Sequence, residues 1–267
     1  PLQWVAERVG GDHVDVASLT PPGAEPHDLE LTPRDVADIT DADVVVYLSG
    51  FQPAVDDAVE QVDDTKAYDA ASAAELDLTY TPIEEGEEAS DEADSTDPHF
   101  WLDPTRLAAV ADDFAAYLGD LDPTHADAYR DNAAVLGDEL ASLDAELEAG
   151  LASCANKDLV TSHNAFGYLA RRYGLTQVGI TGLTPEEEPS AEQLASVSDF
   201  VESHDVHTIY FETLVSPAIA DSVASETGAR TDVLDPIEGL NDESQGTDYL
   251  EVMRANLANI QEGQPCP

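Results

Sequence analysis

The chain has 267 residues, of which 57 are acidic and 10 are basic, so its formal net charge at pH 7 is −47. Such a charge repels phosphate, which excludes nucleic acid and anionic membranes as preferred partners. Hydrophobic residues make up 42% of the chain, enough for a folded core, and the length suits two domains.

The acidic residues are spread along the whole chain instead of forming one tail. In molar salt the screening length falls to roughly 3 Å, so that an acidic surface no longer repels itself and keeps the protein soluble. We therefore hypothesise that the protein is adapted to a salt-loaded environment and has a halophilic surface.

The first third of the chain alternates short apolar runs with helical patterns. VDVASL (14–19) and VVVYLS (44–49) are typical of buried strands. Between them, Thr32 followed by Pro33 predicts a capped helix start, and residues 54–62 predict a second helix. This βαβ rhythm indicates a parallel sheet.

An acidic segment interrupts the rhythm at residues 84–97, which contain eight acids and no large apolar residue. This composition is typical of a solvated loop. The loop ends at PHFWLDP, where Asp103-Pro104 predicts another helix start.

One long helix is predicted after Asp122-Pro123. Its length would be about 28 residues, or around 40 Å at 1.5 Å per residue. Leucines repeat on one face at spacings of four, three, four and four, at Leu136, Leu140, Leu143, Leu147 and Leu151. We interpret the helix as a rigid connector between two αβ regions.

The last third returns to alternating strands and helices. Strands are expected at DLVTS, QVGI, TIYFE and TDVLD, each followed by a helical pattern. The predicted fold class is therefore α/β, with two αβ lobes that have parallel sheets and are joined by one long backbone helix. The predicted domains are an N-terminal lobe at 1–121, the connecting helix at 122–152 and a C-terminal lobe at 153–267.

Four candidate metal ligands are His27, His99, His163 and Asp235. In open α/β sheets, ligands bind at the carboxyl ends of strands. Asp235 ends a predicted strand and His163 stands immediately after one. His27 follows the first strand through a Pro-Gly turn, and His99 lies at the start of a helix after the acidic loop. Three imidazoles and one carboxylate suit Zn²⁺ or, less tightly, Mn²⁺.

The remaining candidates carry less weight. His13 and His125 are expected to face solvent, and the pair His204 and His207 does not share a face. Glu212 ends a strand and could be an outer partner of the site, an alternative ligand or a helix cap. No nucleophile elbow, phosphate loop or dinucleotide fingerprint occurs.

Two cysteines, Cys154 and Cys266, have neither metal-knuckle spacing nor a CxxC pattern. They could pair, which would close a long loop and stabilise the protein by roughly 4 to 5 kcal/mol. The alternative is one buried thiol and one terminal thiol, and the sequence leaves both open.

Six motifs occur in an order that resembles one known family. They are SLTPPGAEPHDLELTPRDV, DPHFWLDP, VTSHNAFGYLARRYGL, EEEPSAEQL, IYFETLVSP and VLDP. The chain resembles, over essentially its whole length, the cluster A-I solute-binding proteins, which are the zinc and manganese receptors of ABC importers. The resemblance implies two lobes on one backbone helix, with a metal site in the cleft between them.

Carried over residue by residue, the resemblance implies that His27, His99, His163 and Asp235 hold the metal. His163 favours zinc over manganese as the transported ligand, whereas the lack of histidines in the acidic loop departs from many zinc receptors. The implied partner is the ABC permease of a metal importer, and release would involve loop rearrangement with little hinging. We expect a monomer that binds no nucleic acid.

The implied location is extracytoplasmic. The chain opens on PLQWVAERVGG, which is typical of the end of a helix, and we take Pro1 as a trimmed end. We expect membrane anchoring through a segment that precedes it. The alternative function is a metal-dependent hydrolase with a three-histidine site and Asp235 or Glu212 as general base.

The halophilic surface can be tested by thermal unfolding at low and high salt. We expect a higher melting temperature in 3 M than in 50 mM salt, because the closer ionic atmosphere screens acid–acid repulsion. Greater stability at 50 mM salt would contradict the hypothesis.

Overall fold

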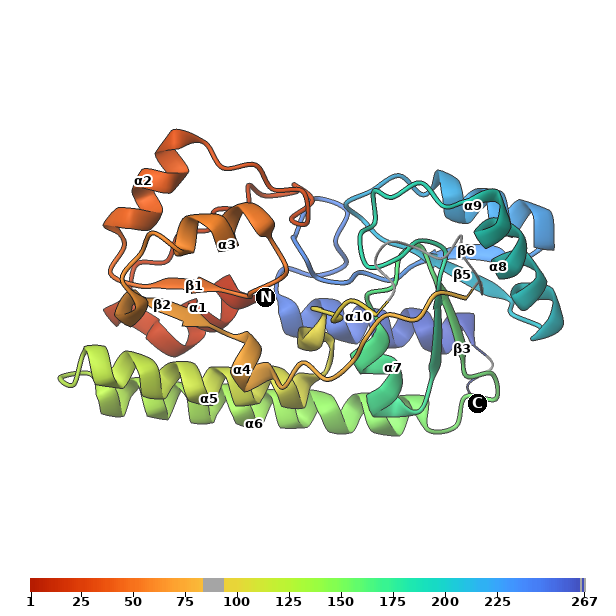
Figure 1. Ribbon diagram of the computed structural model, residues 1–267. Helices are drawn as coiled ribbons and strands as arrows, with labels where there is room; N and C mark the ends of the chain where they lie inside the picture. The colour runs from red at the N-terminus through yellow and green to blue at the C-terminus, as the bar shows by residue number, and fades with distance from the viewer. Residues whose placement is uncertain (84–93, 265, 267) are drawn as a thin grey trace.

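The computed structural model describes residues 1–83, 94–264 and 266. Figure 1 shows two αβ lobes side by side above a pair of long helices, α5 (Pro104–Leu121) and α6 (Ala126–Leu151). The two-lobe α/β fold is therefore confirmed, while the domain boundaries at 121 and 152 stay a prediction. Most of the acidic loop, at 84–93, lies outside the described residues.

The first lobe is built on a two-stranded parallel sheet. Its elements are α1 (Leu2–Gly10), η1 (Gly11–His13), α2 (Pro33–Asp41), β1 (Val45–Tyr47), α3 (Pro53–Val59), η2 (Asp64–Lys66), β2 (Ala67–Asp69) and α4 (Ala71–Ala74). Strand β1 pairs with β2, and α3 forms the crossover. Helix α2 begins as predicted, because the Thr32 side chain accepts from the Asp35 N–H and the Asp35 carboxylate accepts from the Thr32 N–H.

The predicted strand at 14–19 is wrong. Val14 and Val16 are partly buried against the core while Asp15 and Ala17 are exposed, so the alternation that suggested a strand is real. The segment forms no ladder with the described residues, because β1 takes β2 as its parallel neighbour. The βαβ unit thus lies one helix later in the chain than the sequence indicated.

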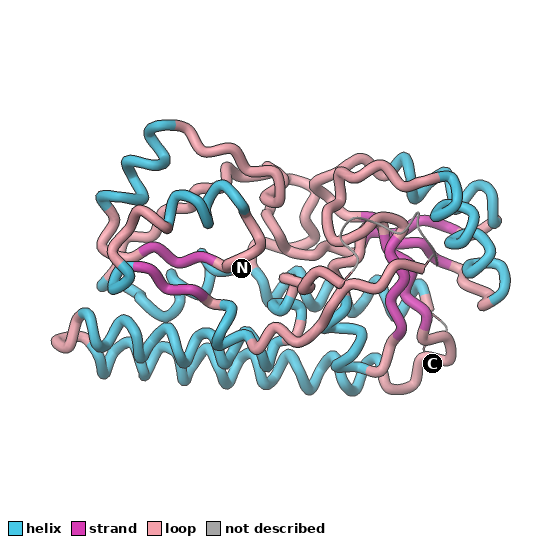
Figure 2. Tube along the Cα trace, in the orientation of Figure 1, coloured by secondary structure: helices cyan, strands magenta, loops and turns pink. Residues whose placement is uncertain are grey.

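The second lobe is a four-stranded parallel sheet in the order β4-β3-β5-β6. Its elements are β3 (Asp158–Thr161), α7 (Gly167–Tyr173), β4 (Thr176–Gly179), α8 (Ala191–Ser203), β5 (Thr208–Phe211), α9 (Ala218–Thr227), β6 (Arg230–Val233) and α10 (Tyr249–Gly263). Figure 2 shows these strands as a group separate from β1 and β2. Ser190 caps α8 through the Gln193 N–H.

Helix α6 is the connector that the leucine repeat predicted. It has 26 residues, or about 39 Å, and runs beneath both lobes (Figure 1). All five leucines of the stripe are at most 1% exposed and belong to one hydrophobic cluster with residues of both lobes. A short 3-10 helix, η3 (Phe100–Leu102), leads into α5, which Asp103 caps through the Thr105 N–H. The lobes therefore share part of their core.

Cys154 and Cys266 form a disulfide across 112 residues. The bond joins the end of α6 to the segment that follows α10. The question that the sequence left open is thus decided in favour of pairing. Among the described residues, no helix is both long enough and apolar enough to span a membrane.

The shared core can be tested on α6 with one buried and one exposed residue. We expect Leu143→Ala to lower the free energy of unfolding by about 2 to 5 kcal/mol, because Leu143 is fully buried and its truncation leaves a cavity. Val135 on the same helix is 56% exposed, so Val135→Ala should change it by less than about 0.5 kcal/mol. Chemical denaturation measures both, and equal effects would contradict the packing of α6.

Candidate metal centre

Three histidines and one glutamate converge at a single point between the lobes. The ring nitrogens of His27, His99 and His163 and a carboxylate oxygen of Glu238 all lie within 4.8 Å of one another. All four residues are buried. The first two come from the first lobe and the other two from the second.

Each of these residues sits on a loop held by a regular element. His27 lies in the turn region that precedes α2, and His99 immediately precedes η3. His163 follows β3 by two residues, and Glu238 lies in the loop after β6. The three histidines lie where the sequence predicted candidate ligands, and the fold brings them together.

Buried carboxylates fix the orientation of two of the imidazoles. His99 Nδ1 lies 2.8 Å from Asp97 Oδ1, and His163 Nδ1 lies 2.7 Å from Glu212 Oε1. Because an ionised carboxylate only accepts hydrogen bonds, each Nδ1 carries the proton and each Nε2 faces the cluster. Outer carboxylates of this kind orient histidine ligands and increase their basicity.

The spacing of the donor atoms matches a tetrahedral ion. Metal–ligand bonds of about 2.0 to 2.1 Å place tetrahedral ligands about 3.3 Å apart. Glu238 Oε1 lies 3.0 Å from His99 Nε2 and 3.2 Å from His163 Nε2. His27 Nε2 lies 3.4 Å from the same oxygen and 3.3 Å from His99 Nε2. The four donors can therefore surround one small cation.

Charge in the cluster shifts the pKa values of its members. Burial alone would lower the pKa of His99 and His163, but their carboxylate neighbours outweigh it and raise both, that of His163 well above 6.5. Burial would likewise raise the pKa of Glu238, but His163 and the other two histidines hold it well below its usual range. The Glu238 carboxylate therefore stays ionised and attracts either protons or a metal ion to the imidazoles.

The structure places Glu238 in the cluster where the sequence analysis expected Asp235. Strand β6 ends at Val233, and the turn that follows uses the Asp235 carboxylate internally. Asp235 Oδ1 accepts from the Ile237 N–H at 2.8 Å, and Oδ2 accepts from Thr213 Oγ1 at 3.3 Å. Asp235 thus shapes the turn that presents Glu238. An acid three residues after Asp235, in the printed stretch DPIEGL, was the available signal.

The turn before Glu238 is strained and tied to the first lobe. Ile237 has a φ of 59°, in the left-handed region that β-branched residues rarely adopt. The Trp101 indole N–H donates to Pro236 O at 2.7 Å, and the Tyr249 hydroxyl donates to Trp101 O at 2.6 Å. These bonds hold the turn against η3, which follows His99 directly.

The other sequence candidates lie away from the cluster or around it. Glu212 is the outer partner of His163 and also accepts from Ser162 Oγ at 2.8 Å, which was one of its three interpretations. His13 is exposed and His125 half-buried, and their rings stack with centroids 4.0 Å apart. His204 stacks on Phe200 instead of pairing with His207. Asp97 was missed, although its place two residues before His99 could have suggested its role.

Two lobes on a long helix, with a closed set of four donors between them, are typical of solute-binding proteins. The family model "Zinc-uptake complex component A periplasmic", ZnuA, matches residues 1–263. The chain belongs to this family, which confirms the resemblance seen in its motifs.

Curated relatives agree with this assignment. The high-affinity zinc uptake system protein ZnuA of Bacillus subtilis is 36% identical over 264 residues, which cover 96% of this chain and 83% of that protein. The zinc-binding lipoprotein AdcA of Streptococcus pneumoniae is 34% identical over 98% of this chain. The chain spans only 54% of AdcA, so it corresponds to about half of that relative.

Solved structures share the fold. The laminin-binding protein Lbp of Streptococcus pyogenes superposes with a TM-score of 0.82 at 34% identity, covering 98% of this chain and 96% of that one. The Zn(II)-bound ZnuA-like domain of Streptococcus pneumoniae AdcA gives a TM-score of 0.79 at 34% identity, with coverages of 98% and 95%.

Metal binding at this cluster should depend on pH. The pKa values of His99 and His163 are raised, so protons occupy these groups in the metal-free protein and must leave before a metal can bind. We therefore expect zinc affinity to fall as the pH decreases, with the loss beginning above pH 6.5, the ordinary histidine pKa. Calorimetric titrations between pH 6 and 8 measure it.

The same pKa shifts give the stability of the metal-free protein the opposite pH dependence to that of zinc affinity. A raised histidine pKa contributes stability that is fully present below pH 6.5 and is lost as the pH rises through the folded value. Zinc-loaded protein should therefore gain melting temperature over metal-free protein as the pH rises. A zinc affinity that is the same at pH 6 and pH 8 would contradict this assignment.

Proposed function

We propose that the protein captures Zn²⁺ between its lobes with His27, His99, His163 and Glu238, and delivers the ion to the membrane permease of an ABC importer. The observation that carries the proposal is the convergence of four buried donor atoms within 4.8 Å. Membership of the zinc-uptake family and the printed names of the relatives support the choice of metal.

The donor set favours zinc over manganese. Three imidazole nitrogens and one carboxylate oxygen suit a borderline ion, whereas Mn²⁺ prefers sites richer in oxygen. The donor separations of 3.0 to 3.4 Å fit a four-coordinate ion. Manganese therefore remains a weaker ligand in this proposal.

Four protein donors complete the coordination shell of a structural zinc site, which leaves no position for a reacting water. The hydrolase alternative also needs a free base. Glu212 is bound to His163 and Ser162, while Asp235 is bound to Ile237 and Thr213. The donors are thus arranged to hold an ion and not to activate a water.

We propose that the protein works outside the cytoplasm as an anchored monomer. A disulfide such as Cys154–Cys266 persists in oxidising, extracytoplasmic surroundings. Relatives are described as lipoproteins, namely AdcA of Streptococcus pneumoniae and the metal-dependent lipoprotein YcdH of Bacillus subtilis. A net charge of −47 would also concentrate divalent cations near the surface.

Release of the ion is proposed to proceed by movement of the loops that carry the ligands. The shared core beneath both lobes resists a large hinge motion, since α6 packs against residues of each. The turn that carries Glu238 includes Ile237 at a positive φ, a strained conformation that stores energy next to a ligand. The four ligands sit on loops, which open more easily than core elements.

The test is a competitive titration of metal-free protein with Zn²⁺ and Mn²⁺ in molar salt. We expect one zinc per chain, bound orders of magnitude more tightly than manganese, as the Irving–Williams order and the nitrogen-rich donor set require. Near-equal affinities would contradict the choice of zinc. Binding of neither ion at micromolar concentration would overturn the site itself.

A matched pair of substitutions separates Glu238 from Asp235 as the fourth ligand. Glu238→Gln removes the proposed ligand charge and should lower zinc affinity more than about 100-fold, beyond the effect of changing an outer partner. Asp235→Asn keeps an oxygen for the Ile237 N–H and should cost less. A larger loss in Asp235→Asn would assign the ligand to Asp235.

A further inference from the structure

Asp97 connects a metal ligand of the first lobe to a helix of the second. Its Oδ1 accepts from the His99 backbone N–H at 2.9 Å and contacts His99 Nδ1 at 2.8 Å. Its backbone N–H donates to Leu78 O at 2.9 Å, and the residue is only 2% exposed. The Asp97 carboxylate therefore has little room to move.

The second oxygen of this carboxylate lies where a side chain on Gly167, the first residue of α7, would begin. A Cβ atom placed on Gly167 would lie 2.6 Å from Asp97 Oδ2 and 3.4 Å from Leu78 Cδ1. Gly167 is not among the glycines with positive φ, so its backbone accepts any residue. Alanine would also favour the helix. The contact with Asp97 is thus the feature that requires glycine here.

Tyr168, the next residue, holds the same segment from the other side. Its hydroxyl donates to Asp97 O at 3.1 Å and accepts from the Leu78 N–H at 3.4 Å. Its ring lies beneath the guanidinium groups of Arg106 and Arg171, at 4.7 and 5.4 Å from the ring centroid. Residues of both lobes therefore enclose this aromatic ring.

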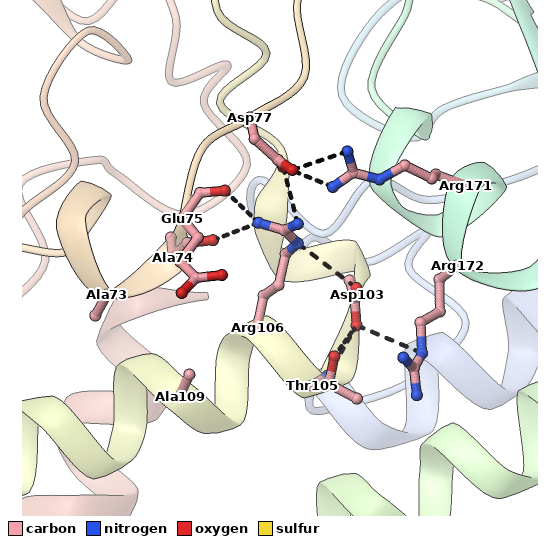
Figure 3. Close-up of a pocket in the computed structure, with 10 residues that line it drawn as sticks. All are labelled: Ala73, Ala74, Glu75, Asp77, Asp103, Thr105, Arg106, Ala109, Arg171 and Arg172. Carbon is pink, nitrogen blue, oxygen red and sulfur yellow. Dashed lines mark hydrogen bonds and ion pairs between the residues drawn. The ribbon is translucent and has the colours of Figure 1, made fainter.

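Ion pairs bind the end of α7 to the first lobe and to α6. Figure 3 shows Arg106 and Arg171 pointing at the same carboxylate, Asp77, from opposite lobes. Arg172 forms a two-point ion pair with Asp144 on α6. These arginines line a cleft of about 560 Å³. Because they already form ion pairs with acids, they hold the two lobes together and do not offer a free site for an anion.

We propose that Gly167 is a positioning residue for metal binding. Its missing side chain lets α7 seat against Asp97, so that the second lobe sets the orientation of the first-lobe ligand His99. Helix α7 begins four residues after His163, so this one short helix affects the positions of metal ligands from both lobes. This inference rests on the proposed zinc site at His27, His99, His163 and Glu238.

The test compares Gly167→Ala with Gly137→Ala in zinc titrations. Gly137 lies within α6 with nothing within 4 Å of a new Cβ, so it controls for the general effect of alanine in a helix. We expect Gly167→Ala to weaken zinc binding about 10- to 100-fold, the range for disturbed outer partners of a ligand. Gly137→Ala should leave zinc binding unchanged.

A double-mutant cycle shows whether the effect passes through Asp97. Asp97→Ala removes the carboxylate that the new methyl group would meet. In that background, Gly167→Ala should change zinc affinity by no more than about twofold, so that the two substitutions are non-additive, as expected of residues in contact. The His99 Nδ1–H proton resonance should shift in Gly167→Ala but not in Gly137→Ala.

The outcomes separate this inference from the proposed function. Wild-type protein that fails to bind zinc overturns the function. If the wild type binds zinc and Gly167→Ala binds it as tightly as Gly137→Ala, only the role of Gly167 is overturned. The same holds if Gly167→Ala lowers zinc affinity as much in the Asp97→Ala background as in the wild type. If Gly167→Ala does not fold, Tyr168→Phe replaces it, and an unchanged affinity there overturns the inference.

Discussion

The proposed metal site depends on the charge balance of three buried carboxylates. Asp97, Glu212 and Glu238 are each at most 7% exposed, and the ion pairs they make within the described residues are with histidines. With neutral imidazoles this group would carry three negative charges in a region shielded from water, which costs several kcal/mol per ion. A divalent cation or protons on the imidazoles reduce that charge. Exchange between protons and metal is therefore built into the site.

The rigid core of the fold and the side chains of the proposed metal site lie in different parts of the molecule. Leucines on α6 join the lobes through one hydrophobic cluster, while the histidines and Glu238 sit on the loops above it. The imidazoles of His99 and His163 are each held by a buried carboxylate, so their direction is set before an ion arrives. Preorganisation of this kind spares the binding energy that would otherwise order the loops.

Much of the fold could be predicted from sequence because the signals were local. Thr32, Asp103 and Ser190 each cap the predicted helix through a backbone N–H within three residues, and the leucine repeat follows one helix face. The strand prediction at 14–19 was wrong because the alternation of apolar and polar residues there reflects partial burial and not pairing with another strand. Whether a segment joins a sheet depends on a distant neighbour, and β2 took that place.

The site shows the same division. His163 could be found because it follows a parallel strand, and such strand ends meet at one edge of a sheet. His27 and His99 follow no strand directly, and the motifs around them were the signal that identified them. Glu238 and Asp97 were not identified from the sequence, because the directions of their side chains depend on turn geometry. Asp235 ends the predicted strand TDVLD, yet a left-handed residue two positions later redirects the chain and brings the next acid inward. No periodic pattern records a turn of that kind.

The backbone of Ile237 has a consequence for affinity that the donor set alone does not show. A β-branched residue held at a φ of 59° stores on the order of 1 to 3 kcal/mol, which a glycine at this position would largely remove. Any part of this energy that relaxes when Glu238 leaves the ion enters the dissociation constant, at tenfold for each 1.4 kcal/mol or so. Strain that is relieved on release weakens binding of the ion, which suits a protein that must give up the ion it has bound.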